Sequence, residues 1–140
     1  MHATVVRTRG GEITIRPLRS GDTSVICGIF GRMGPQSRRL RFGAAKNGLA
    51  RGELELLSAV DARRHVLVAY ADGEPIGLAR LARDEDDRTV AEVAFAVVDD
   101  WQGKGVGTAL MEELSAVARA AGIQRFRASI LAENRASLAL

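Results

Sequence analysis

The chain has 140 residues, of which 46% are hydrophobic and 26% charged, and its formal net charge is +3. This length and composition are ordinary for one globular domain. The only cysteine, Cys27, excludes an intramolecular disulfide, and no run of about 18 apolar residues predicts a membrane span. With no apolar leader at the N-terminus, we expect a cytoplasmic protein of one domain, residues 1–140.

The first half of the chain predicts one strand followed by short helices. The expected elements are a strand at 12–17, a helix ending near residue 30, and helical segments at 37–42 and 49–57. Ser20 or Asp22 would cap the first helix, because short polar side chains satisfy free amides at a helix start. Gly34-Pro35 interrupts the helical segments.

The second half predicts a three-strand meander followed by a helix. The expected elements are strands at 66–70, 76–82 and 90–98, a helix reaching about residue 121, a strand at 125–131 and the start of a last helix at 133 or 134. Asp72-Gly73 predicts a hairpin turn between the first two of these strands. Gly122 predicts a left-handed residue that ends the long helix.

The stretch Gln102-Gly103-Lys104-Gly105-Val106-Gly107 lies between the third meander strand and the long helix. Glycines at a helix start let free amides approach an anion, so this stretch predicts a phosphate site. A dinucleotide fingerprint does not fit, because Thr108 stands where its last glycine belongs. A Walker A loop does not fit either, because Gly105 follows Lys104.

The stretch does match [RQ]-x-x-G-x-[GA], the pyrophosphate signature of the GNAT superfamily of acyl-CoA N-acyltransferases, which the chain resembles from residue 12 to 140. ITIRPLRSGD, GPQSRRLRF and AEVAFAVVDDWQGKGVGTAL are similar to the acetyltransferase domain of bacterial protein-lysine acetyltransferases. The resemblance implies an α/β fold (α+β by some schemes) with a mixed, mostly antiparallel central sheet flanked by helices. It also implies acetyl-CoA as donor, an amine as acceptor and no metal.

Glu92 interrupts the apolar strand 90–98 and shares one face with Ala94 and Ala96, whose small side chains leave room for a ligand. By resemblance, a Glu at this position is the general base that deprotonates the acceptor amine. A desolvated setting would raise the pKa of such a carboxyl group. The alternative is a carboxylate on a solvated sheet face, paired with an arginine.

The resemblance also implies a set of cofactor contacts. Those to pantetheine come from the backbone of Ala96, Val97 and Val98, and those to phosphate from Gln102, Gly103, Lys104, Gly105, Val106, Gly107 and Thr108, with a further contact from Asn134. Gln102 would either contact phosphate or close the loop. Lys104 would be either a point charge for the phosphate or a solvated lysine.

The chain departs from the family pattern at its C-terminal end. It stops at Leu140, before the Tyr that serves relatives as general acid and before the strand that completes the fold. The sequence can be a shortened piece, a neighbouring chain can supply the strand, or the protein can be a degraded or regulatory relative. An unpaired sheet edge there would favour a homodimer.

Two functions follow from these patterns. The first is an acetyl-CoA-dependent N-acetyltransferase whose acceptor is a protein lysine or a small-molecule amine. The second is a catalytically weak acyl-CoA-binding regulatory module. Basic residues between 32 and 51 have only two aromatic residues near them, Phe30 and Phe42, to stack on bases, so we expect no nucleic-acid partner. His2, His65 and Cys27 have no metal-ligand spacing.

Overall fold

The computed structural model describes residues 3–33, 58–61, 63–129 and 135–139. In chain order the elements are β1 (Thr4–Thr8), β2 (Gly11–Pro17), α1 (Thr23–Gly31), β3 (Arg64–Ala71), β4 (Glu74–Arg83), β5 (Val90–Val97), the 3₁₀ turn η1 (Asp99–Trp101), α4 (Val106–Ala120), β6 (Arg125–Ser129) and β7 (Arg135–Ala139). The helical segments expected at 37–42 and 49–57, and Asn134, lie outside these residues.

The strands of this part of the chain form one sheet in the order β1-β2-β3-β4-β5-β6-β7. Each neighbouring pair is antiparallel except β5 and β6, which run parallel because α4 crosses over between them. The sheet is therefore mixed and mostly antiparallel, as predicted. The predicted hairpin turn is confirmed at Asp72 and Gly73, which have φ of 51° and 80°.

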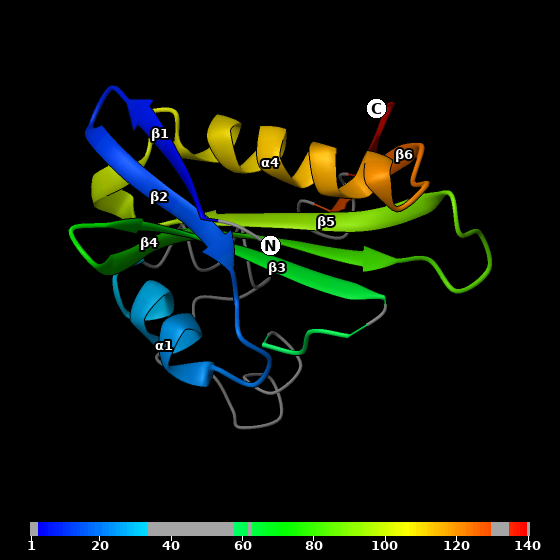
Figure 1. The fold of residues 1–140 in the computed structure, drawn as a ribbon, viewed down its shortest axis with the longest axis horizontal. Coiled ribbons are helices and arrows are strands. Elements are labelled where there is room, and N and C mark those ends of the chain that lie inside the picture. The colour runs from blue at the N-terminus through cyan, green and yellow to red at the C-terminus, as the bar shows by residue number, and fades with distance from the viewer. Residues whose placement is uncertain (1–2, 34–57, 62, 130–134, 140) are drawn as a thin grey trace.

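The two α-helices of the described residues cover opposite faces of the sheet: α4 lies along one face and α1 lies on the other (Figure 1). Helix α4 buries a stripe at helical spacing, which includes Leu110 and Leu114. Gly77 on β4 permits the close approach, because a Cβ there would lie 3.3 Å from Val106 Cγ1 and 3.5 Å from Leu110 Cδ1. Neither α-helix is long and apolar enough to cross a membrane.

The last element differs from the sequence prediction. Residues 135–139 form β7 rather than the start of a helix, and β7 pairs with β6 from Arg125↔Ala139 to Ser129↔Arg135. Pairing as a strand satisfies backbone groups along the edge of β6, and this long-range pairing outweighs the local helix signal at 133–134. The edge of β6 is thus paired within the chain, and β7 is the edge strand on this side of the sheet. The homodimer stays a prediction.

Strand β1 is a second difference, because no strand was predicted before residue 12. It pairs with β2 from Thr4↔Ile15 to Thr8↔Gly11 and forms the edge of the sheet. Thr4 Oγ1 donates a hydrogen bond to Glu113 Oε2 of α4 at 3.2 Å. The β1–β2 hairpin is therefore attached to the helix that follows the glycine-rich loop.

Candidate acyl-donor site

The glycine-rich loop leads into α4 through a left-handed backbone. Gly103 and Gly105 have φ of 73° and 93°, and Gly105 is the N-cap residue of the helix. The first helical hydrogen bond is donated by the Ala109 amide to the Gly105 carbonyl at 3.0 Å. The amides of Val106, Gly107 and Thr108 therefore precede the hydrogen-bonded ladder, and they lie at the positive end of the helix dipole.

A cavity of 290 Å³ opens beside these amides. Its lining residues are Arg9, Val97, Trp101, Gln102, Gly103, Gly105, Val106, Gly107 and Thr108. The lining holds one cation, Arg9, and no carboxylate, so its charge favours an anion. Seven of the predicted phosphate and pantetheine contacts thus surround one cavity, and Lys104 is the predicted loop residue that does not line it.

Gln102 and Lys104 make contacts within the protein. Gln102 Nε2 donates to the Val97 carbonyl at 3.0 Å, so this side chain closes the loop onto the end of β5. Lys104 Nζ donates to the Asp100 carbonyl at 2.8 Å and lies 5.4 Å from the centre of the Trp101 ring. The Gln102 contact fits loop closure, and the Lys104 ammonium group bonds a carbonyl of the protein itself; a phosphate contact for either residue stays a prediction.

In the described part of the chain, β5 has no paired strand on its β6 side after Val93. Among the described residues β6 pairs with β5 only from Val90 to Val93, although β5 continues to Val97. The Val98 amide donates to the Ile76 carbonyl at 2.9 Å, so the alternation of an antiparallel ladder directs the Phe95 and Val97 amides away from β4. These two residues face the gap beyond β6.

This alternation changes the predicted pantetheine contacts. The Val98 amide is already bonded to β4, and Ala96 has the same backbone orientation because it lies two residues away. Of the three predicted residues, Val97 alone directs its amide toward the gap. Phe95, which the sequence analysis did not include, has the equivalent orientation two residues earlier. The strand register reveals it, and register is not readable from one strand's sequence.

Glu92 lies on β5 just before the gap. It is exposed, and its register neighbours are Ala82 on β4 and Arg127 on β6. The expected desolvated setting is therefore wrong for the described residues, because Glu92 lies exposed on its face of the sheet. Five residues of strand separate Glu92 from Val97, or about 17 Å.

Arginines surround Glu92 on its face of the sheet. Burial is the main reason that the pKa of Arg80 is lowered; the charge of Arg64 acts in the same direction and the Glu92 carboxylate opposes both. Arg127 Nη1 lies 3.5 Å from Asp84 Oδ2. Glu92 is thus a solvent-accessible carboxylate whose charge reaches Arg80, a setting that fits both the predicted base and the alternative of a paired surface carboxylate.

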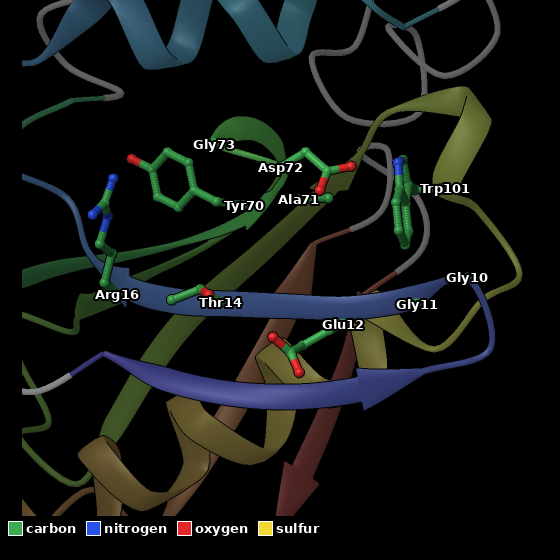
Figure 2. A pocket seen from close by; sticks show the side chains of 10 residues that line it. All are labelled: Gly10, Gly11, Glu12, Thr14, Arg16, Tyr70, Ala71, Asp72, Gly73 and Trp101. Atoms are coloured by element: carbon green, nitrogen blue, oxygen red, sulfur yellow. The ribbon is translucent and has the colours of Figure 1, made fainter.

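A second, larger cavity lies on the other side of Trp101. It measures 540 Å³ and is bordered by β2 and the end of β3 (Figure 2). Arg16 Cζ lies 4.2 Å from the centre of the Tyr70 ring, so its cation is held by an aromatic face. Glu12 and Asp72 also line this cavity. Two carboxylates disfavour phosphate, and the smaller cavity is therefore the better phosphate site.

Among the described residues, no three His, Cys, Asp or Glu side chains gather in a way that could hold a metal ion. Within the basic segment predicted between 32 and 51, only Arg32 is described. Its guanidinium lies 3.5 Å from Glu74 Oε2 and 3.8 Å from Asp100 Oδ2. Arg32 is thus engaged with acidic groups of the protein itself.

The chain belongs to the acetyltransferase (GNAT) family, whose model matches residues 37–140. It is similar to acetyltransferase Pat of Mycolicibacterium smegmatis, with 36% identity over 135 residues that cover 94% of this chain and 40% of that protein. It is also similar to acetyltransferase PA5475 of Pseudomonas aeruginosa, with 30% identity over 132 residues that cover 91% of this chain and 70% of that protein.

Solved structures agree with this assignment. The GNAT domain of S. lividans PAT superposes with a TM-score of 0.85 and 32% identity, covering 94% of this chain and 80% of that one. The cAMP-binding acyltransferase from Mycobacterium smegmatis gives a TM-score of 0.62 and 35% identity, covering 95% of this chain and 39% of that one. The family and fold predicted from the sequence are confirmed. This chain spans about two fifths of the Mycolicibacterium relative's length.

Proposed function

We propose that this protein is an N-acetyltransferase that moves an acetyl group directly from acetyl-CoA to a primary amine of a protein lysine. The observation that carries the proposal is that Val97 lines the phosphate cavity and also ends the stretch of β5 after Val93 that has no paired strand on that side among the described residues. A donor anchored by its pyrophosphate at the cavity would extend its pantetheine arm along Phe95 and Val97. Its thioester would then lie near Glu92.

In this proposal the amides of Val106, Gly107 and Thr108 bind the pyrophosphate, and the Thr108 hydroxyl is close enough to contribute because it lines the same cavity. The Phe95 and Val97 amides bind pantetheine as a further strand would. The amide nearest the thioester polarises its carbonyl oxygen as negative charge develops there. The site needs no metal for this chemistry.

Glu92 acts as general base. A lysine amine has a pKa of about 10.4 and is almost wholly protonated at neutral pH, so it must lose a proton before it attacks. The proton passes to Glu92 and then to solvent. The neutral amine nitrogen then forms a bond to the thioester carbon, the carbon–sulfur bond breaks, and CoA leaves as a thiolate. The nitrogen loses its second proton to solvent, which leaves a neutral amide. A thiol pKa of about 8.5 makes that thiolate a tolerable leaving group.

The exposure of Glu92 supports a protein acceptor over a small-molecule amine. Small-molecule sites enclose most of the ligand's surface, whereas Glu92 is open to solvent. A lysine on a protein surface would dock together with the residues around it, and these residues would exclude water from Glu92. The similarity to bacterial protein-lysine acetyltransferases points the same way. We further propose one domain, a cytoplasmic location and no nucleic-acid or membrane partner.

The test is release of free CoA from acetyl-CoA with a panel of lysine-containing proteins and small amines. We expect turnover with the proteins, and a fall of about 10² to 10⁴-fold in kcat/KM for Glu92→Gln. Glu112→Gln is the matched control, because Glu112 is an exposed carboxylate on α4. Full activity of the Glu92→Gln variant across the pH range would show that Glu92 is not the general base. Acetyl-CoA binding without turnover of either acceptor class would favour the regulatory module.

A further inference from the structure

The turn of the β1–β2 hairpin forms part of the wall of the phosphate cavity. The Arg9 amide donates to the Lys104 carbonyl at 3.1 Å, which joins the hairpin to the glycine-rich loop. A Cβ on Gly10 would lie 2.6 Å from Trp101 Cζ3 and 2.7 Å from Lys104 Cδ. Figure 2 shows Trp101 beside this turn. Gly10 is therefore a positioning residue that lets the hairpin dock closely enough to bring Arg9 to the loop.

The cation at this cavity is Arg9 rather than Lys104. Lys104 bonds the Asp100 carbonyl and is absent from the cavity lining, whereas Arg9 lines it. Within the described residues, no hydrogen bond or ion pair involves the Arg9 guanidinium. The nearby carboxylates are engaged elsewhere: Asp99 accepts from Gln102 Nε2 at 3.4 Å, and Asp100 lies 3.8 Å from Arg32.

We propose that the Arg9 guanidinium binds the pyrophosphate of the acyl donor, opposite the amides of Val106 to Thr108. This inference rests on the proposed function and adds a binding residue to it. Three amides at a helix start provide only partial positive charge, about half an elementary charge for the whole terminus. A pyrophosphate diester carries two negative charges. A guanidinium supplies a full charge and can bind phosphate oxygens in bidentate fashion.

The test compares three variants by isothermal titration with acetyl-CoA. Arg9→Gln removes the proposed contact, and Arg7→Gln is the matched control because Arg7 is an exposed arginine on the same hairpin that does not line the cavity. Lys104→Gln tests the residue that the sequence motif suggests. We expect Arg9→Gln to weaken Kd about tenfold, which is about 1.4 kcal/mol, Arg7→Gln to leave Kd within about twofold, and Lys104→Gln to weaken it less than Arg9→Gln.

Two further measurements distinguish the pyrophosphate from the 3′-phosphate of CoA. They also distinguish a failure of the Arg9 contact from a failure of the proposed function. The Arg9→Gln effect should persist with acetyl-3′-dephospho-CoA and shrink as salt is raised, because the contact is ionic and partly exposed. Loss of the effect with the dephospho donor would overturn the pyrophosphate contact. Equal Kd values for Arg9→Gln and wild type, or a larger loss for Lys104→Gln, would overturn the role of Arg9 while leaving the proposed function intact. Failure of the wild type to bind acetyl-CoA would overturn both.

Discussion

Gly103, Gly105 and Gly107 belong to one motif, but they are glycine for different reasons. Gly103 and Gly105 have positive φ, a backbone region that costs other residues about 1–2 kcal/mol. Gly107 has no positive φ, and a Cβ added to it would meet no protein atom within 4 Å. The fold therefore requires the first two glycines, and we infer that a bound ligand requires the third.

Gly107→Ala should separate binding from folding. Alanine is favoured over glycine inside a helix by roughly 0.5–1 kcal/mol, so the melting temperature should stay the same or rise. The added methyl group should occupy space that the pyrophosphate needs and weaken acetyl-CoA binding about tenfold or more. Gly105→Ala is the comparison variant, which should lower the melting temperature. Wild-type affinity in Gly107→Ala would show that no ligand packs against this residue.

At the scale of elements, the approach of α4 to β4 sets where the loop amides lie. A Cβ on Gly77 would lie 3.1 Å from the Ala96 carbonyl oxygen as well as close to Val106 and Leu110. Gly77→Ala should therefore push α4 outward and cost about 1–3 kcal/mol of unfolding free energy. It should also weaken acetyl-CoA binding, because the helix start moves.

Urea denaturation and titration with acetyl-CoA would check the Gly77 prediction. Gly31→Ala is the matched control, because a Cβ there meets nothing within 4 Å and Gly31 lies in a helix. This control should be neutral or slightly stabilising. A Gly77→Ala protein with wild-type stability and affinity would contradict the proposed dependence of the loop on close helix–sheet packing.

The sequence predicted those elements whose signal is local. Strands β2 to β6 and helices α1 and α4 follow from alternation, helical periodicity and turn residues within each segment. Strand β1 was not predicted, although its β-branched residues Thr4, Val5, Val6 and Thr8 favour a strand; its pairing with β2 establishes it. Strand β7 depends on pairing with β6, and this distant partner outweighed the helix signal at 133–134.

The candidate site likewise contains residues that could be predicted from the sequence and residues that could not. The loop motif and its place before α4 could be read from adjacent residues, as could Glu92 on its strand. The place of Arg9 in the site could not be predicted, because the hairpin brings it to a loop more than ninety residues away in sequence. Nor could the engagement of Lys104 with Asp100 or the exposure of Glu92, which depend on side-chain packing in three dimensions.

At the scale of the whole molecule, His65 makes stability depend on pH. Its Nε2 is buried and has no hydrogen-bond partner among the residues that the structure describes, and burial lowers the pKa of His65 from 6.5. The unfolded chain therefore binds a proton at higher pH than the folded protein does. The stability contributed by neutral His65 is fully present above pH 6.5 and is lost as pH falls from 6.5 through the folded pKa.

His65→Gln should flatten this dependence. The wild type should lose stability between pH 7.5 and 5, and the variant should lose less, because glutamine does not titrate. Asp61 and Asp87 have lowered pKa values, from 3.8, through hydrogen bonds to Arg63 and Thr89, so their losses fall at lower pH. Urea midpoints at several pH values would measure the difference. Parallel pH profiles for the two proteins would exclude His65 as the source.

We propose that the start of α4, Arg9 and the edge of β5 after Val93 together hold an acyl-CoA. Titration of the ¹⁵N-labelled protein with acetyl-CoA tests it residue by residue. We expect large amide shifts at Gly105 to Thr108, at Arg9, and at Phe95 and Val97, with little change around Glu12 and Tyr70 in the second cavity. Saturable shifts confined to that second cavity, or no shifts at millimolar acetyl-CoA, would contradict it.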